Sequence, residues 1–216
     1  ERKKPSWRQK VTQCAHNQQL IGKAYFAYAN DHDGKFPIVP GPAAVGGQLG
    51  DGIGAKGKKL PNIVSRLYGA KVPEKERPLN KYIANIKSFH CPADTGGGAY
   101  SVPSCWKTFG NSYQVQAGDD FFRVRHSVGV SSEPKDSDEG KPITMAEIAK
   151  SPKNKIIQGD WNWPYDREDA WHDLFGLAHH VMLFGDGRAE LFLFPPTRTM
   201  TNWFLKPLPD PKFRWW

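Results

Sequence analysis

The stretch VTQCAHNQQLIGKAYFAYANDHDGKFP, residues 11–37, decides the fold, because it predicts one long amphipathic helix closed by a polar turn. Apolar side chains recur along it at steps of three and four residues, which places them on one face of a helix. They are Val11, Cys14, Ile21, Tyr25 and Tyr28, with Gln18 as a polar gap in the series. Turn formers at residues 30–34 follow, so the helix should end near Asn30. Its apolar face must be covered by later parts of the chain.

Segments further along the chain predict an antiparallel sheet to cover that helix. The clearest is a hairpin, in which residues 181–184 and 189–194 are joined across Gly185-Asp186-Gly187. Further strands are expected at residues 88–91, 112–116, 121–130 and 156–161, and short helices at 61–68, 78–86 and 144–149. In the last of these helices, Thr144 and Glu147 have the spacing of a capping box.

The expected fold class is therefore α+β, with a long N-terminal helix packed on an antiparallel β-sheet and long loops. Residues 1–37 would form the spine helix and its exit turn, and residues 38–216 a loop-rich sheet head, together one domain. Residues 38–60 are too rich in glycine to pack alone and are expected to be a surface loop, as is the polar segment 131–142.

Composition agrees with a loop-rich globular protein. The chain has 216 residues, 38% hydrophobic content, a mean hydropathy of -0.62, and 21 Gly with 18 Pro. It contains no run of eighteen apolar residues, and its first residues do not form a signal peptide. A formal charge of +8 favours an acidic partner or an anionic surface. Since no nucleic-acid recognition module is present, nucleic acid is not expected as a partner.

Three cysteines allow one disulfide with one thiol left over. Cys14 lies on the apolar stripe and Cys91 ends an apolar run, so a bridge between them would tie the helix to the sheet. A bridge between Cys91 and Cys105 is the alternative, and three buried thiols are a third. Either bridge would fit an oxidising compartment such as the periplasm. No C-x-x-C spacing occurs, which argues against a zinc site.

Four motifs occur in an order that resembles type IV pilin-like proteins, and most closely the type II secretion pseudopilin relatives of planctomycetes and verrucomicrobia. The first motif combines Cys14, Asn17, residues 19–22 (QLIG), residues 28–31 (YAND), Asp33-Gly34 and Phe36-Pro37. The others are residues 89–94 (FHCPAD), 111–113 (NSY) and 183–188 (LFGDGR). The chain departs from the family at Gly176, where many members have a histidine.

The resemblance implies a pilin-like fold and a structural role without catalysis. The chain would be a subunit of a type II secretion or type IV pilus-like filament, with other pilin-like subunits and the secretion machinery as partners. A methylated, apolar helix preceding Glu1 would anchor it in the membrane, with the folded part on the periplasmic or cell-surface face of the bacterial inner membrane. Ile21, Tyr25 and Tyr28 would then be core and assembly residues.

Carboxylates in polar turns give one cofactor expectation, calcium. Asp31, Asp33, Asp94 and Asp186 lie in such turns, and a hard cation takes several oxygen ligands. Some pseudopilins of this general kind hold calcium in a loop. However, no complete calcium-binding loop motif is present, and carboxylates in turns usually cap their own backbone. Backbone capping is the favoured alternative.

Two further groups of residues have alternative interpretations. Asp160, His172, Asp173, His179 and His180 would gather as a metal or general-base cluster, but no catalytic motif accompanies them, so a structural role is favoured. Trp161, Trp163 and Trp203 would stack on sugar rings if exposed and belong to the core if buried. A secreted carbohydrate-binding or adhesive module is therefore the alternative function.

Overall fold

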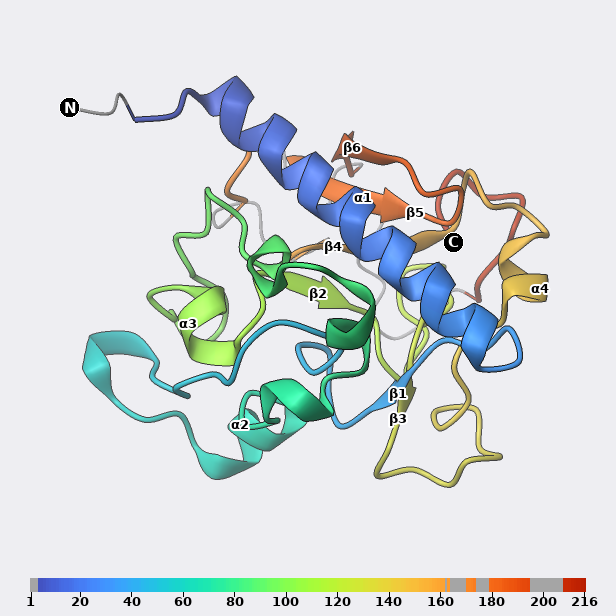
Figure 1. Cartoon of the computed structure of the whole chain (residues 1–216), viewed down its shortest axis with the longest axis horizontal. Helices are drawn as coiled ribbons and strands as arrows, with labels where there is room; N and C mark the ends of the chain where they lie inside the picture. Colours follow the sequence, from blue (N-terminus) through green and yellow to red (C-terminus); the bar gives the residue numbers. More distant parts are fainter. Residues whose placement is uncertain (1–3, 162, 164–169, 174–178, 195–207) are drawn as a thin grey trace.

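The computed structural model describes residues 4–161, 163, 170–173, 179–194 and 208–216, and its longest element is helix α1, Trp7–Asp31 (Figure 1). The helix begins with a capping box that the sequence reasoning missed. Ser6 Oγ accepts a hydrogen bond from the Gln9 backbone N–H, and Gln9 Oε1 accepts one from the Ser6 N–H. The helix ends within one residue of the predicted position, and Gly34 takes the positive φ of 74° in the exit turn.

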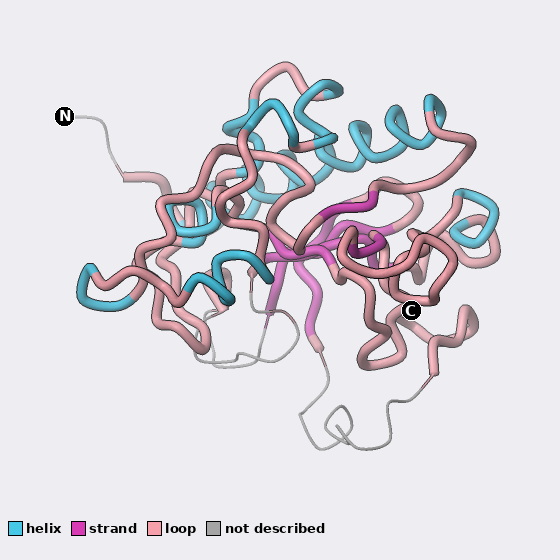
Figure 2. Tube along the Cα trace, turned by 90° about the horizontal axis from the view of Figure 1, so that it is seen from below, coloured by secondary structure: helices cyan, strands magenta, loops and turns pink. Residues whose placement is uncertain are grey.

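The sheet is antiparallel and has the strand order β2-β4-β5-β6. Its strands are β2 (Tyr113–Val115), β4 (Ile156–Asp160), β5 (His179–Phe184) and β6 (Ala189–Leu193). The predicted C-terminal hairpin is confirmed as β5 and β6, with Gly187 in its turn at a φ of 84°. Every residue of β4 and all but the first of β5 are buried, because both faces of the sheet are covered. Helix α1 lies on one face (Figures 1 and 2), and a second hydrophobic cluster that includes Phe122, Trp163 and Trp215 packs against the other. The chain is thus an α+β protein, as predicted.

Close packing and one buried amide fix α1 on β5. Gly22 lets the helix approach the strand, since a Cβ at this position would lie 3.0 Å from Leu183 Cδ1. Gln18, the polar gap in the apolar series, is fully buried, and its Nε2 donates a hydrogen bond of 2.5 Å to Val181 O. The gap is therefore a specific polar contact between the helix and the strand backbone.

Two of the three predicted short helices are confirmed. They are α2 (Asn62–Leu67) and α4 (Met145–Ile148), the latter with the expected capping box of Thr144 and Glu147. The predicted helix at residues 78–86 is instead two 3-10 helices, η3 (Pro78–Tyr82) and η4 (Ile86–Phe89). Three further short helices were not predicted: η1 (Ala55–Gly57), η2 (Glu74–Glu76) and α3 (Cys105–Phe109).

Two predicted strands are wrong. Residues 88–91 do not form one, because η4 extends through Phe89. Within residues 121–130 the strand is limited to β3 (Gly129–Val130), since Phe122 and Arg123 adopt positive φ values of 53° and 66° in a tight turn that pairs Phe121 with Val124. β3 pairs in parallel with β1 (Ile38–Val39), so these residues form a small second sheet instead of extending the main one.

The prediction that residues 38–60 form a surface loop is also wrong in part. Ala43, Ala44 and Val45 have no exposed surface and belong to the core. Buried backbone needs hydrogen-bond partners, and the guanidinium of Arg77 supplies them. It donates to Ala43 O at 2.6 Å and to Gly46 O at 2.9 Å. The loop packs inward because a charged side chain from another segment satisfies its carbonyls.

The end of the chain returns to the sheet beside β4. The Trp216 N–H donates to Asn154 O, and Trp216 O accepts from the Ile156 N–H, both at 2.9 Å.

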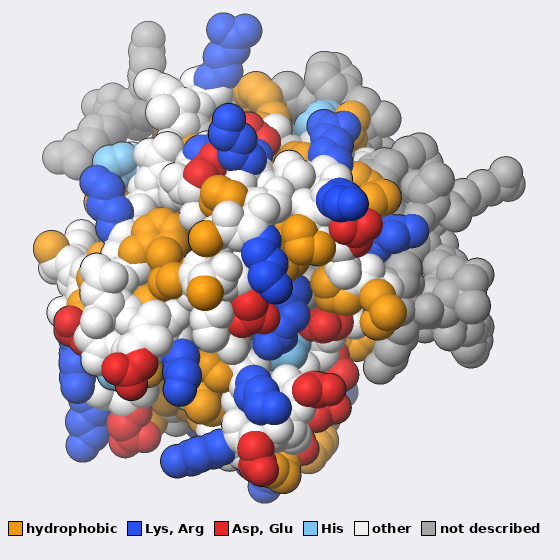
Figure 3. All heavy atoms as spheres, turned by 90° about the vertical axis from the view of Figure 1, so that its right-hand side faces the viewer, with side chains coloured by type: hydrophobic (Ala, Val, Ile, Leu, Met, Phe, Trp, Pro, Cys, Tyr) orange, Lys and Arg blue, Asp and Glu red, His pale blue; other side chains and the backbone are white. Residues whose placement is uncertain are grey.

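On the face that Figure 3 shows, basic and acidic side chains are interspersed, so the formal charge of +8 does not form a single basic field there. Among the described residues, no helix is long and apolar enough to cross a membrane.

Candidate functional site

Four buried side chains with metal-ligating atoms meet between α1 and the sheet. Cys14 comes from α1, Cys91 follows η4, Asp160 ends β4, and His172 lies in the segment before β5. At most 1% of any of them is exposed. One ligand atom from each lies within 4.8 Å of the others. We call this group the Cys-Asp-His cluster.

Three contacts hold the cluster together. Cys14 Sγ donates a hydrogen bond to Asp160 Oδ1 at 3.1 Å, and Cys91 Sγ lies 3.2 Å from His172 Nε2. The same imidazole nitrogen lies 3.8 Å from Asp160 Oδ2. The backbone supports these positions, since the Val181 N–H donates to Asp160 Oδ2 at 2.7 Å. The cluster thus joins α1 to three segments of the sheet head.

The electrostatics of the cluster follow from burial and mutual contact. Burial opposes ionisation of Cys91, but hydrogen bonds with Cys14 and His172 lower the pKa of the Cys91 thiol below its ordinary value. Burial also opposes protonation of His172, yet the Asp160 carboxylate raises the pKa of this imidazole to about 9. Burial raises the pKa of the Cys14 thiol well above its usual range. The contacts within the cluster therefore favour ionisation of Cys91 and protonation of His172, whereas burial disfavours ionisation of Cys14.

The geometry does not match a nucleophilic active site. In a cysteine or serine triad, the carboxylate holds the imidazole nitrogen that does not face the nucleophile. Here Cys91 and Asp160 both approach Nε2 of His172, and Nδ1 has no hydrogen-bond partner among the described residues. A substrate would also have to enter a fully buried site. The arrangement can bind a small cation, or it can hold the segments together as a polar core.

The cysteines partly follow the sequence expectation. Cys14 and Cys91 do come together, but the structure contains no disulfide, so neither this bridge nor that between Cys91 and Cys105 is formed in it. Cys105 lies in another hydrophobic cluster, with Phe109 and Trp161. Of the candidate assembly residues, Ile21 and Tyr25 are buried and Tyr28 is partly buried against the same core.

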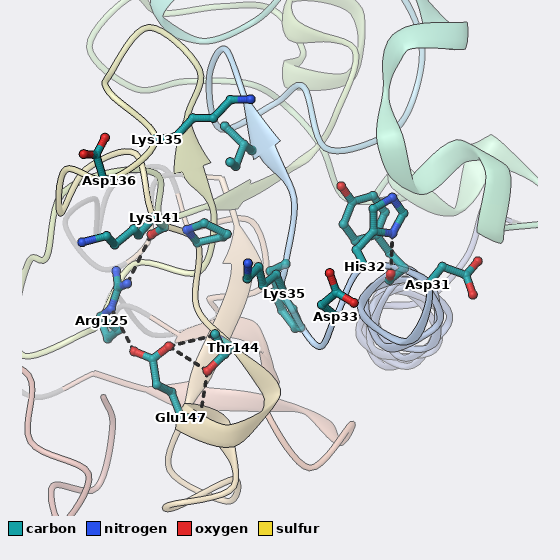
Figure 4. A pocket seen from close by; sticks show the side chains of 14 residues that line it. Asp31, His32, Asp33, Lys35, Arg125, Lys135, Asp136, Lys141, Thr144 and Glu147 are labelled. Atoms are coloured by element: carbon teal, nitrogen blue, oxygen red, sulfur yellow. Dashed lines mark hydrogen bonds and ion pairs between the residues drawn. The ribbon is translucent and has the colours of Figure 1, made fainter.

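The four candidate calcium ligands do not gather into one site. Asp31 accepts a hydrogen bond from Tyr82 Oη at 2.9 Å, and Asp186 pairs with the Arg188 guanidinium at 2.8 Å in the hairpin turn. Asp31 and Asp33 border the same hollow, but their side chains point in different directions (Figure 4). Within the described part of the chain, the Cys-Asp-His cluster is the group of three or more ligating residues that the structure brings together.

Asp94 caps backbone N–H groups, which is the role that the sequence favours over calcium binding. Its carboxylate accepts hydrogen bonds from two hydroxyl groups and three backbone N–H groups. The donors are Ser104 Oγ, Ser112 Oγ and the N–H groups of Gly96, Cys105 and Trp106. This pattern is the backbone-capping alternative, and it fixes the start of α3 against the strand that begins at Tyr113.

The hollow in Figure 4 has a volume of about 780 Å³. It lies between the end of α1, the loop at residues 135–141 and the start of α4. Its polar side chains have both signs of charge, and Arg125 and Glu147 pair within it at 3.6 Å. It offers no convergent set of ligands for an anion or for a cation.

The aromatic and histidine candidates divide between core and cluster. Trp161 and Trp163 are each 4% exposed, so they provide no stacking surface for a sugar, and Trp203 lies outside the described residues. Of the histidines grouped with Asp160, His172 joins the Cys-Asp-His cluster. The others do not join it: His179 pairs with Asp173 at 3.2 Å, and His180 is buried in β5.

The sequence predicts a bridge between Cys14 and Cys91, and a group of Asp160 and His172 with other histidines. It does not predict that these four side chains meet. The usable signal is the helical phase of Cys14, which directs its side chain to the sheet.

A comparison with protein-family models, curated proteins and solved structures finds no match.

Proposed function

We propose that this chain is the folded outer part of a pseudopilin-like subunit, which acts by assembling with other pilin-like subunits in a type II secretion or type IV pilus-like filament. In this proposal an apolar helix upstream of residue 1 anchors the subunit in the membrane, and the folded part lies on the periplasmic or cell-surface side. The subunit catalyses no reaction. The support comes from how the four sequence motifs contact one another.

The observation that carries the proposal is that motifs far apart in the sequence form one contact system along α1. Asn17 Nδ2 of the first motif donates to His90 O of the second at 2.9 Å. Asp94 of the second motif accepts from Ser112 Oγ of the third at 2.7 Å. The first motif meets the fourth where Gly22 lies against Leu183. Motif residues that serve a common fold are expected to contact one another in this way.

The outer face of α1 supplies the surface for assembly. Its exposed residues recur at steps of three and four along the helix: Arg8, Thr12, His16, Gln19 and Lys23. No acidic side chain occurs on α1 before Asp31, so this face is polar and basic. A neighbouring subunit with acidic groups would be complementary to it.

Cross-linking in the organism that encodes the chain tests the proposal. A Gln19→Cys variant of the full gene product places a thiol on the exposed face of α1, where the native cysteines are buried. Treatment of intact cells with a bifunctional maleimide should give dimers and higher multimers. Lys58→Cys is the matched control and should remain largely monomeric. Lys58 is exposed directly after η1, and the cyan loop that contains η1 projects away from α1 in Figure 1.

Fractionation of the same cells completes the test. The gene product should sediment with membranes or sheared filaments, and loss of the upstream segment should release it. Recovery of the Gln19→Cys variant as a monomer in the soluble fraction, with no multimers after cross-linking, would refute the assembly role.

A further inference from the structure

We infer that the Cys-Asp-His cluster is a structural zinc site, in which Cys14, Cys91, Asp160 and His172 bind one ion. The inference rests on the cluster geometry and is independent of the filament role. The sequence argues against a zinc site because it contains no C-x-x-C spacing. The four proposed ligands come from four separate segments, so no local spacing could reveal them.

The separations between ligand atoms fit a tetrahedral zinc ion. With Zn–S bonds of about 2.3 Å and Zn–N or Zn–O bonds of about 2.0 Å, neighbouring ligand atoms in a tetrahedron lie roughly 3.3–3.8 Å apart. The Cys14 Sγ to Asp160 Oδ1 distance is 3.1 Å, that from Cys91 Sγ to His172 Nε2 is 3.2 Å, and that from His172 Nε2 to Asp160 Oδ2 is 3.8 Å. The two distances to Asp160 involve its two different carboxylate oxygens, and all four ligand atoms lie within 4.8 Å of one another. The widest separations would therefore have to close by up to about 1 Å when zinc binds.

The chemistry of the donors selects zinc. Two thiolates, an imidazole and a carboxylate are borderline to soft ligands, whereas calcium and magnesium prefer oxygen ligands alone. Four protein ligands also leave no open position for water, which is the pattern of a structural site rather than a catalytic one. On binding, the ion displaces the thiol protons of Cys14 and Cys91 and any proton on the ligating nitrogen of His172 to solvent, without a change of oxidation state.

Surrounding backbone groups are placed to support the ligands. The Val181 N–H donates to the Asp160 carboxylate, and the Ala93 N–H donates to Cys91 Sγ at 3.4 Å. Hydrogen bonds of this kind orient metal ligands and stabilise thiolates. A cation would also compensate the cost of holding several ionisable groups away from water. The ion would cross-link α1, the turn after η4, the end of β4 and the segment before β5.

Metal analysis of the purified full chain tests the inference. The protein is prepared in reducing, chelator-free buffer with equimolar zinc and then desalted, and zinc per chain is measured by mass spectrometry. We expect about one zinc per chain in the wild type and below about 0.1 in Cys14→Ser and Cys91→Ser. Cys105→Ser is the matched control, since it removes a buried cysteine outside the cluster, and should keep the full zinc content.

Two further measurements keep the result decisive if a serine variant folds poorly. Cobalt bound to the wild type should show the visible absorption of a tetrahedral thiolate site, and chelation should lower the melting temperature, with recovery on adding zinc but not calcium. A wild type that retains no zinc overturns the inference, whether its thiols are all reduced or Cys14 and Cys91 have formed a disulfide. Equal zinc loss in Cys105→Ser also overturns it.

Discussion

Arg77 should be among the most sensitive positions for stability, although no sequence pattern singles it out. Its side chain is fully buried, and burial lowers the pKa of its guanidinium to about 10, which leaves it charged at neutral pH. The five N–H groups of the guanidinium contact six backbone carbonyls of three segments, so that one N–H is shared between two acceptors. The acceptors are Ala43 O, Gly46 O, Gly69 O, Ala70 O, Val72 O and Phe109 O.

The cost of Arg77→Met follows from these contacts. Hydrogen bonds to a charged group contribute about 1.5 kcal/mol each at the low end, so the five N–H groups represent roughly 7.5 kcal/mol. Methionine avoids the burial of a charge, which returns several kcal/mol. The expected net loss is about 3–5 kcal/mol, a large fraction of the stability of an ordinary domain. Arg77→Lys keeps the charge but cannot reach carbonyls in all three segments, so it should lose about half as much.

Urea unfolding followed by tryptophan fluorescence measures these losses. Trp161 packs in the cluster that contains Ala43 and Phe109, so its emission reports on this region. Arg66→Met is the matched control, because Arg66 is exposed on α2 and its removal should change the free energy of unfolding by less than about 0.5 kcal/mol. If Arg77→Met is destabilised no more than Arg66→Met, the carbonyls have other partners and the reasoning fails.

Three other changes test separate parts of the structure. Asp94→Asn removes the charge that five donors share and should cost about 2–4 kcal/mol in urea unfolding, whereas the exposed Asp138→Asn should cost almost nothing. Gly22→Val overpacks the contact with Leu183 and should lower the free energy of unfolding by about 2 kcal/mol or more, whereas Gly22→Ala should lower it by much less. Equal losses for the two variants would exclude close packing as the cause. Burial, reinforced by the charge of the neighbouring His172, lowers the pKa of His180 to about 3. The His180 imidazole therefore stays neutral in the folded protein at pH values at which the unfolded chain takes up a proton on this residue. The stability from His180 is thus fully present above pH 6.5 and should fall by about 1.4 kcal/mol per pH unit towards pH 3. His180→Phe should lose this slope, and parallel stability curves for variant and wild type between pH 7 and 4 would contradict the assignment.

The helix and the hairpin were predictable because their signals are local. The apolar repeat from Val11 to Tyr28 and the Gly-Asp-Gly turn each fix a structure within a few residues. The failures lie where distant segments decide. The chain at residues 38–60 looked like a surface loop because nothing in it shows that Arg77 would satisfy its carbonyls. At residues 121–130 the apolar pattern resembled a strand, yet the positive φ of Phe122 and Arg123 bends the chain.

The candidate site was predictable only as separate pieces. Cys14 was expected on the buried face of the helix, and Asp160 at the end of a strand, and both expectations hold. Their meeting depends on the register of α1 against β4 and β5, which the sequence periodicity does not specify. A helix can slide by one turn and still bury an apolar stripe, so a pattern of apolar residues alone leaves several registers open.

Polar side chains on the covered face of α1 remove that ambiguity. Cys14 contacts Asp160, Asn17 donates to His90 O, Gln18 donates to Val181 O, and Tyr25 Oη donates to Gln158 Oε1 at 3.1 Å. A shift of one turn would break all four contacts at once and leave buried donors unpaired, at a cost of about 1–3 kcal/mol for each. Apolar burial therefore brings the helix to the sheet, and the polar contacts select one register. The Cys-Asp-His cluster can form in that register alone, which makes it a consequence of the packing of α1 rather than its cause.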